Sequence, residues 1–141
     1  MVKPFSQTFI IEGRNFINAG KASTGIKSVL KQLGIDAAVI RRVAIATYEA
    51  EMNVVMYAQQ AVLTFEVTPK AIRIVVDDKG PGIPDIGLAM QEGYSTATEA
   101  IREMGFGAGM GLPNIKKNSD ELKIESTVGR GTKLEFTVNI N

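Results

Sequence analysis

The sequence contains no cysteine and no histidine among its 141 residues. Without cysteine the chain has no disulfide framework and no thiolate metal site, a composition that suits a reducing compartment. The lack of histidine removes the commonest zinc ligand, the commonest general base and the imidazole that accepts phosphate in some signalling proteins. Any proton-transfer chemistry must therefore depend on other residue types.

An excess of one charge and long apolar runs are lacking too. Sixteen basic residues face 15 acidic ones, so no electrostatic footprint for nucleic acid exists. No apolar run approaches the length of a membrane span, and the N-terminus lacks the apolar core of a signal peptide. The length fits a single domain over residues 1–141. We therefore expect a soluble, cytoplasmic domain that binds neither nucleic acid nor membrane.

The hydrophobic pattern predicts both strands and helices. Strands are predicted at 6–12, 61–67, 71–76, 121–127 and 132–140. Helices are predicted at 15–33, 36–59, 84–90 and 110–118. Gly34 closes the first helix and Asp36 caps the second. This order predicts an α+β fold, a two-layer α/β sandwich with helices on one face of a mixed, mainly antiparallel sheet.

A carboxylate followed by two glycines stands directly after the strand at 71–76, in the pattern Asp78-x-Gly80-x-Gly82. The carboxylate can accept a hydrogen bond from an exocyclic amine, and the glycines let the backbone approach a flat base closely. The same pattern also describes an ordinary strand-to-loop turn. A ligand site here therefore needs partners elsewhere in the chain.

The second predicted helix supplies an acid and an amide one turn apart. Glu49 and Asn53 are spaced i, i+4, so they share one helix face beside the buried stripe. This pair can be a hydrogen-bonded pair on the helix surface, or it can point into a cleft together with the glycine turn.

Two further glycine patterns follow: Gly107-x-Gly109-x-Gly111 before the helix at 110–118, and Gly129-x-Gly131-Thr132 between the last strands. Neither the P-loop pattern nor the glycine spacing of dinucleotide-binding folds is present. A P-loop is therefore excluded, and the glycine spacing argues against a dinucleotide-binding fold.

Taken in order, the four patterns resemble the sequence boxes of the GHKL (Bergerat-fold) ATP-binding family. That family includes gyrase-type topoisomerases, chaperone ATPases, histidine kinases and mismatch-repair ATPases. The resemblance covers roughly residues 5–140, which is nearly the whole chain.

On the adenine side, the resemblance implies that Asp78 accepts a hydrogen bond from the adenine amine. Guanine would place a carbonyl oxygen there, and two acceptors facing each other in a poorly solvated pocket would select against it. Thr132 would complete the adenine contact through its hydroxyl, directly or through water. Gly80 and Gly82 would pass beneath the base.

On the phosphate side, the resemblance implies that backbone N–H groups of Gly107, Gly109 and Gly111 bind the phosphates at a helix N-terminus. Asn53 would be an oxygen ligand to Mg²⁺, and Glu49 would be the general base. Residues 93–104 would form a lid, from which Arg102 would reach the γ-phosphate as a catalytic cation.

Within the family, the chain looks closest to the bacterial anti-sigma-factor and switch serine/threonine protein kinases. The implied activity is Mg-ATP-dependent transfer of the γ-phosphate to a Ser or Thr of a STAS-domain partner, either an anti-anti-sigma or a scaffold protein. The alternative is a non-catalytic, ATP-gated regulator that sequesters a sigma factor or activates a phosphatase. A homodimer is also compatible with the sequence, although no long exposed apolar stripe marks a surface for it.

Overall fold

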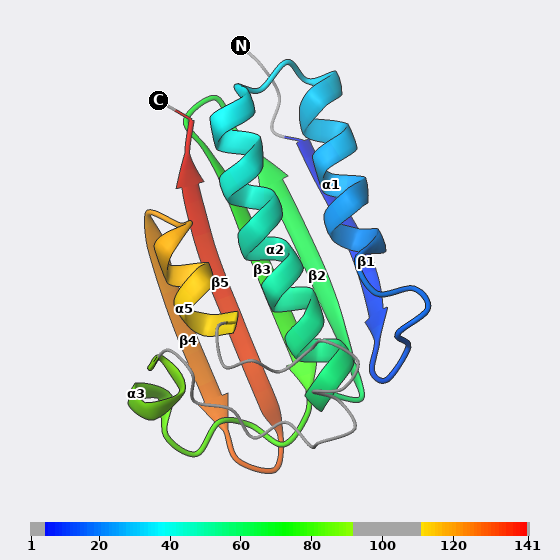
Figure 1. The fold of residues 1–141 in the computed structure, drawn as a ribbon, viewed down its shortest axis with the longest axis vertical. Helices are drawn as coiled ribbons and strands as arrows, with labels where there is room; N and C mark the ends of the chain where they lie inside the picture. The colour runs from blue at the N-terminus through cyan, green and yellow to red at the C-terminus, as the bar shows by residue number, and fades with distance from the viewer. Residues whose placement is uncertain (1–4, 92–110, 141) are drawn as a thin grey trace.

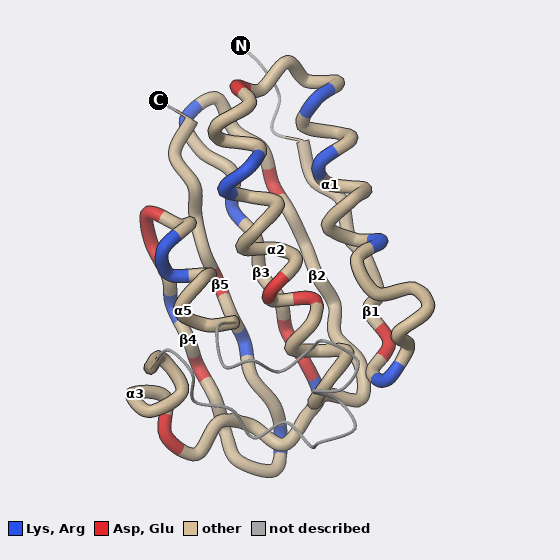
Figure 2. Tube along the Cα trace, viewed as in Figure 1, with Lys and Arg blue, Asp and Glu red and all other residues tan. Residues whose placement is uncertain are grey.

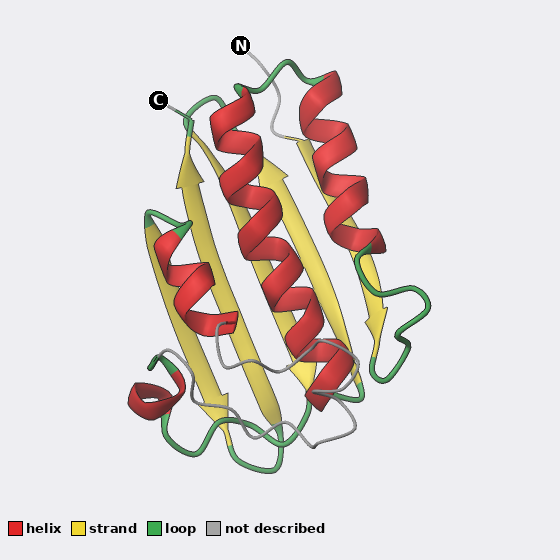
Figure 3. Ribbon diagram, viewed as in Figure 1, coloured by secondary structure: helices red, strands yellow, loops and turns green. Residues whose placement is uncertain are grey.

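The computed structural model describes residues 5–91 and 111–140, which form a layer of helices on one face of a single sheet (Figure 1). The strands are β1 (Phe5–Glu12), β2 (Gln60–Val67), β3 (Ala71–Lys79), β4 (Glu121–Thr127) and β5 (Gly131–Asn139). The helices are α1 (Lys21–Gln32), α2 (Ala37–Tyr57), α3 (Ile86–Ala89) and α5 (Gly111–Lys117). The colouring by secondary structure in Figure 3 separates the two layers. The expected α+β sandwich is thus confirmed.

The sheet has the strand order β1-β2-β3-β5-β4. Both predicted hairpins are present, since β2 pairs with β3 and β4 pairs with β5. All four ladders among the described residues are antiparallel, so the parallel pairing that a mixed sheet requires is not found in this part of the chain. The pairing of β3 with β5 brings Asp77 opposite Lys133, which places the glycine turn after β3 next to the hairpin of the last two strands.

The core lies between the sheet and α2, which crosses its centre (Figure 1). Alternate residues of β3 and β5 point into it: Ile72, Ile74, Val76, Leu134, Phe136 and Val138 are buried. Asp36 caps α2 as predicted, because its side chain accepts a hydrogen bond from the N–H of Ala38 (3.1 Å). The basic and acidic residues of the helices are separated along the chain. Lys and Arg recur along α1 and the start of α2, while the acidic residues of α2 lie in its second half (Figure 2).

The first helix is shorter than predicted, since it begins at Lys21 and not near residue 15. Gly20 has a φ of 93°, a left-handed conformation that no α-helix continues through. Before it, the Asn15 side chain accepts a hydrogen bond from the N–H of Asn18 (3.2 Å) and holds the chain in a turn. The apolar spacing continued across this turn because Phe16 and Ala19 still pack against the core.

The third strand runs to Lys79, beyond its predicted end at Val76, so Asp78 lies within β3. Strand alternation then puts Asp78 on the same face as Ile74 and Val76, toward the helices. The remaining strands, α3 and α5 start and end within a few residues of their predicted bounds.

Candidate active site

Asp78 points toward the helix layer and is half-buried. Its Oδ1 accepts a hydrogen bond from the N–H of Thr132 on β5 (2.9 Å). Burial raises the pKa of this carboxyl, and the Asp77 charge adds to the rise, while the Thr132 N–H offsets part of it. One carboxylate oxygen is thus fixed by the sheet. Among the described residues nothing donates to Oδ2, which leaves an acceptor of the kind that an amine would need.

The glycines around Asp78 are explained by close backbone contacts. A Cβ on Gly82 would lie 2.5 Å from the carbonyl oxygen of Thr127, and its φ of 77° is left-handed. A Cβ on Gly131 would collide with the backbone carbonyl of Asp78. Two backbone hydrogen bonds fasten the turn after β3 to the last hairpin: Gly129 N–H to the Pro81 oxygen (2.8 Å) and Gly80 N–H to the Arg130 oxygen (3.3 Å). Two separate glycine patterns of the sequence therefore form one substructure.

Two hydroxyls complete this substructure. The Thr132 side chain is buried, and its Oγ1 lies 2.9 Å from Oγ of Ser126. Ser126 Oγ in turn accepts a hydrogen bond from the N–H of Ile83 (2.7 Å). Thr132, the expected adenine-side residue, therefore contacts Asp78 through its N–H, while its hydroxyl is hydrogen-bonded to Ser126.

Glu49 and Asn53 lie on the face of α2 that meets the N-terminus of α5. A Cβ on Gly111 would lie 3.0 Å from Asn53 Oδ1 and 3.5 Å from Glu49 Oε2. Burial raises the pKa of Glu49 above that of an exposed glutamate, and a hydrogen bond from the Asn114 side chain offsets part of the rise. Glu49 and Asn53 are each half-buried, and both lie against the start of α5. Their shared role in a cleft stays a prediction.

The sheet-side group contacts the C-terminal end of α2, the helix that carries Glu49 and Asn53. A Cβ on Gly80 would lie 3.1 Å from Cα of Ala58, the residue that caps α2, and 3.2 Å from Oδ1 of Asp78. Asn53 is in the last turns of the same helix. The structure thus brings together Asp78, Gly80, Gly82 and Thr132 on the sheet side, and Glu49, Asn53 and Gly111 on the helix side.

Several predicted residues lie outside the described part of the chain. These are Arg102, Gly107, Gly109 and the lid at 93–104. Their roles stay predictions.

The expected Mg²⁺ fits the donor chemistry of the helix-side group. Asn53 offers an amide oxygen, a hard neutral ligand, and Mg²⁺ is commonly held by one or two protein ligands together with phosphates. Among the described residues no cluster of three or more acidic side chains forms a closed metal cage. Asn53 therefore suits an ion that arrives with a nucleotide.

Sequence reasoning missed three polar residues that shape the site. Asn114 lies one helical turn after Gly111, a position from which it reaches Glu49. Ser126 belongs to no recognisable sequence motif, and only the register of the β4–β5 hairpin, which pairs it with Thr132, reveals its place in the site. Glu51 is 2% exposed and continues the buried stripe of α2 four residues after Thr47, so its helical spacing did contain a signal.

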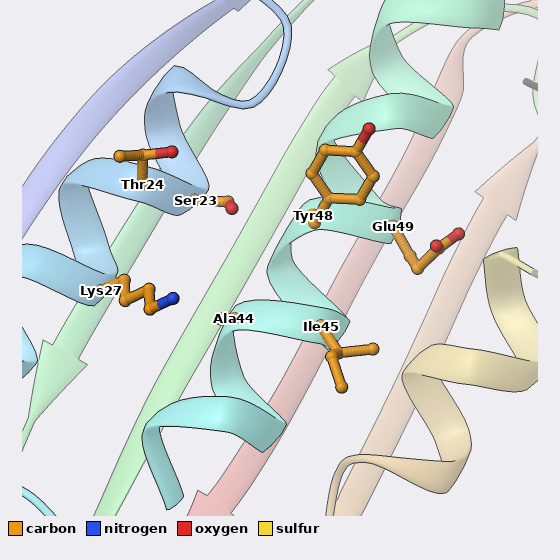
Figure 4. A pocket seen from close by; sticks show the side chains of 7 residues that line it. All are labelled: Ser23, Thr24, Lys27, Ala44, Ile45, Tyr48 and Glu49. Carbon is orange, nitrogen blue, oxygen red and sulfur yellow. The ribbon is translucent and has the colours of Figure 1, made fainter. Parts of the chain in front are cut away.

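A shallow groove of about 320 Å³ opens on the outer side of the helix layer, between α1 and α2. Figure 4 shows its walls. Ser23, Thr24 and Lys27 come from α1, and Ala44, Ile45, Tyr48 and Glu49 come from α2. Glu49 lies at the edge of this groove, and its carboxylate points away from α1, toward α5 (Figure 4).

Comparisons with known proteins show the family and the fold of this chain. Residues 17–138 match the family model of the histidine kinase-like ATPase domain. The serine/threonine-protein kinase RsbT of Bacillus subtilis is 33% identical over 113 residues, which are 77% of this chain and 79% of that protein. The anti-sigma F factor of Caldanaerobacter subterraneus is 32% identical over 125 residues, 85% of this chain and 84% of that protein.

Two solved structures share the fold. The RsbU and RsbW domains of a Mycobacterium tuberculosis protein align over 94% of this chain and 32% of that one, with a TM-score of 0.59 and 18% identity. The mycobacterial sensor histidine kinase MprB aligns over 97% of this chain and 96% of that one, with a TM-score of 0.54 and 14% identity.

Proposed function

This chain belongs to the histidine kinase-like ATPase domain family, and from that premise we propose that it is an Mg-ATP-dependent protein serine/threonine kinase of the anti-sigma regulatory type. The observation that carries the proposal is the packing of the half-buried Glu49 and Asn53 against Gly111 at the start of α5, near the end of α2 that contacts Gly80.

Adenine recognition is assigned to Asp78. Its Oδ1 is fixed by the Thr132 N–H, so its Oδ2 is held ready to accept from an exocyclic amine. A guanine carbonyl would leave two acceptors facing each other where water is partly excluded, which disfavours GTP.

Proton removal is assigned to Glu49. A raised pKa strengthens a carboxylate as a base, and the hydrogen bond from Asn114 orients it. When bound, Mg²⁺ would neutralise charge on the phosphates, with the Asn53 oxygen as its protein ligand. Glu49 is then left to take the proton of the acceptor hydroxyl.

The protein substrate is proposed from the relatives. RsbT is named a serine/threonine-protein kinase, and the relative from Caldanaerobacter subterraneus is named an anti-sigma F factor. We propose a STAS-domain anti-anti-sigma or scaffold protein as the acceptor, in the cytoplasm. Among the described residues no helix has the length and apolarity needed to cross a membrane.

The test is transfer of label from γ-labelled ATP to Ser or Thr of purified STAS-domain proteins. Glu49→Gln should lower transfer at least about a hundredfold, the usual contribution of a general base, while ATP binding is kept. Glu125→Gln, an exposed change on β4, should leave the rate unchanged. Full activity of Glu49→Gln would show that Glu49 is not the base.

The anti-sigma F relatives favour a second candidate, an ATP-gated regulator that sequesters a sigma factor or activates a phosphatase without transferring phosphate. That function predicts capture of a partner that depends on nucleotide and is equal for the wild type and Glu49→Gln. Labelled acceptor in the wild type alone supports the kinase.

A further inference from the structure

Glu51 is a buried carboxylate that the proposed chemistry does not use. It lies two residues after Glu49 and is 2% exposed. Its oxygens accept three backbone hydrogen bonds from the start of α1: Gly20 N–H (3.0 Å), Ala22 N–H (3.2 Å) and Ser23 N–H (3.0 Å). Among the described residues no Lys or Arg forms an ion pair with it.

These bonds cap α1 from another helix. Gly20 is the N-cap residue of α1 and has no side chain to cap it, and the first turn contains no acidic residue. A helix N-terminus needs acceptors for its free N–H groups and favours negative charge. Glu51 supplies both, so the first turn of α1 is held at one place along α2.

That first turn forms one wall of the groove beside Glu49. Ser23, which donates to Glu51, lines the groove together with Thr24 and Lys27 (Figure 4). Gly20 contacts the opposite wall, because a Cβ on it would lie 3.5 Å from the Tyr48 ring. The bonds to Glu51 therefore join the turn that carries Ser23 to α2, the helix that forms the other wall.

We propose that Glu51 is a positioning residue for the protein substrate: by fixing the first turn of α1 against α2, it forms the groove in which the acceptor segment docks on its way to Glu49. This inference rests on the proposed kinase function. The groove offers exposed apolar surface at Ile45 (38%) and Tyr48 (40%) and a cation at Lys27. It suits an acceptor segment with an apolar and an acidic side chain near its Ser or Thr.

Kinetics with a STAS-domain acceptor separate this role from simple stabilisation. Glu51→Gln keeps the shape but turns an NH₂ group toward N–H donors, so one wall of the groove should shift. We expect the KM for the acceptor to rise about tenfold, while kcat and the KM for ATP stay within about twofold. Equal loss in kcat and both KM values, or no change, would overturn the proposal.

Chemical rescue gives a second, independent readout. Glu51→Ala leaves three N–H groups around a small cavity, which formate can enter. Added formate should return the acceptor KM of Glu51→Ala toward the wild-type value and leave the wild type unchanged. Val29→Ala is the matched control, because it shortens a core-facing side chain in the second half of α1, away from the first turn. It should lower stability without changing the acceptor KM.

A spectroscopic measurement distinguishes failure of this inference from failure of the kinase proposal. If the wild type labels no acceptor, the kinase proposal fails. Amide NMR of Glu51→Gln still tests the anchor: the signals of Gly20, Ala22 and Ser23 and the Tyr48 ring should shift, and faster hydrogen exchange should be confined to the first turn of α1. Unchanged signals would refute the anchor.

Discussion

At the scale of single residues, the partly buried carboxylate of Asp78 lowers the stability of the folded state at neutral pH. The side chain is half-buried on the helix-facing side of β3, and burial raises its pKa. The folded state therefore holds its proton more tightly than the unfolded state does. This contribution to stability is complete at low pH and is lost as the pH rises through the raised pKa.

Asp78→Asn should accordingly raise stability at neutral pH. The amide cannot ionise, and its oxygen still accepts from the Thr132 N–H. In denaturant melts, the gain over wild type should be small near pH 4 and larger near pH 7. Glu125→Gln, at an exposed position, should show no such trend. A gain that shrinks toward neutral pH would contradict this assignment of the raised pKa.

Thr47 on α2 is a second residue whose buried polar group lowers the stability of the fold. It is fully buried, and its hydroxyl has no hydrogen-bond partner among the described residues. Thr47→Val replaces the hydroxyl by a methyl group of similar size and should stabilise the fold by about 1 kcal/mol. Thr24→Val, at an exposed position on α1, should change the free energy of unfolding little. Destabilisation by Thr47→Val would mean that the hydroxyl has a partner.

At the scale of elements, the helix-side group depends on how closely α5 approaches α2. Gly111 begins α5 directly against the Asn53 side chain, and a Cβ there would lie 3.0 Å from Oδ1 of Asn53, so that side chain would have to move by a few tenths of an ångström to admit it. This close contact explains why glycine is needed at a position where helix propensity would favour alanine. The lack of a side chain at the first residue of α5 thus allows this helix to lie close to α2.

Gly111→Ala should therefore weaken nucleotide binding without unfolding the chain. The new methyl group would displace the Asn53 oxygen, so we expect affinity for Mg-ATP to fall about tenfold. Among the described residues, the new methyl group of Gly87→Ala in α3 would meet only the Asp85 side chain, at 3.4 Å, so this variant serves as the control. Calorimetric titration checks both variants. Unchanged affinity in Gly111→Ala would show that the Asn53 side chain does not contribute to Mg-ATP binding.

The elements were predictable from the sequence to the extent that local chemistry decides them. Asp36 and Gly34 mark helix ends by their own side chains or conformations, and the structure confirms both. The predicted start of the first helix was wrong because the apolar spacing continues through a turn at Gly20, whose left-handed backbone delays the helix to Lys21. Residues such as Ser126 and Glu51 act through partners far along the chain, so their roles follow from register and packing and not from a local pattern.

At the scale of the whole molecule, the antiparallel sheet brings distant parts of the sequence to one place. The pairing of β3 with β5 sets Asp78 beside Thr132, and α2 spans the same sheet so that its last turns meet Gly80 (Figure 1). On the opposite face of the sheet, Arg73 bonds Glu66 (2.8 Å) and Glu135 (2.9 Å) across three strands. The sheet is thus a scaffold, with polar contacts on one face and the candidate site on the other.

The most direct measurement is calorimetric titration of the wild type and Asp78→Asn with Mg-ATP and with Mg-GTP. The wild type should bind ATP at least about tenfold more tightly than GTP, and Asp78→Asn should lose that preference. Equal binding of both nucleotides by the wild type, or an unchanged preference in Asp78→Asn, would contradict adenine recognition by this carboxylate.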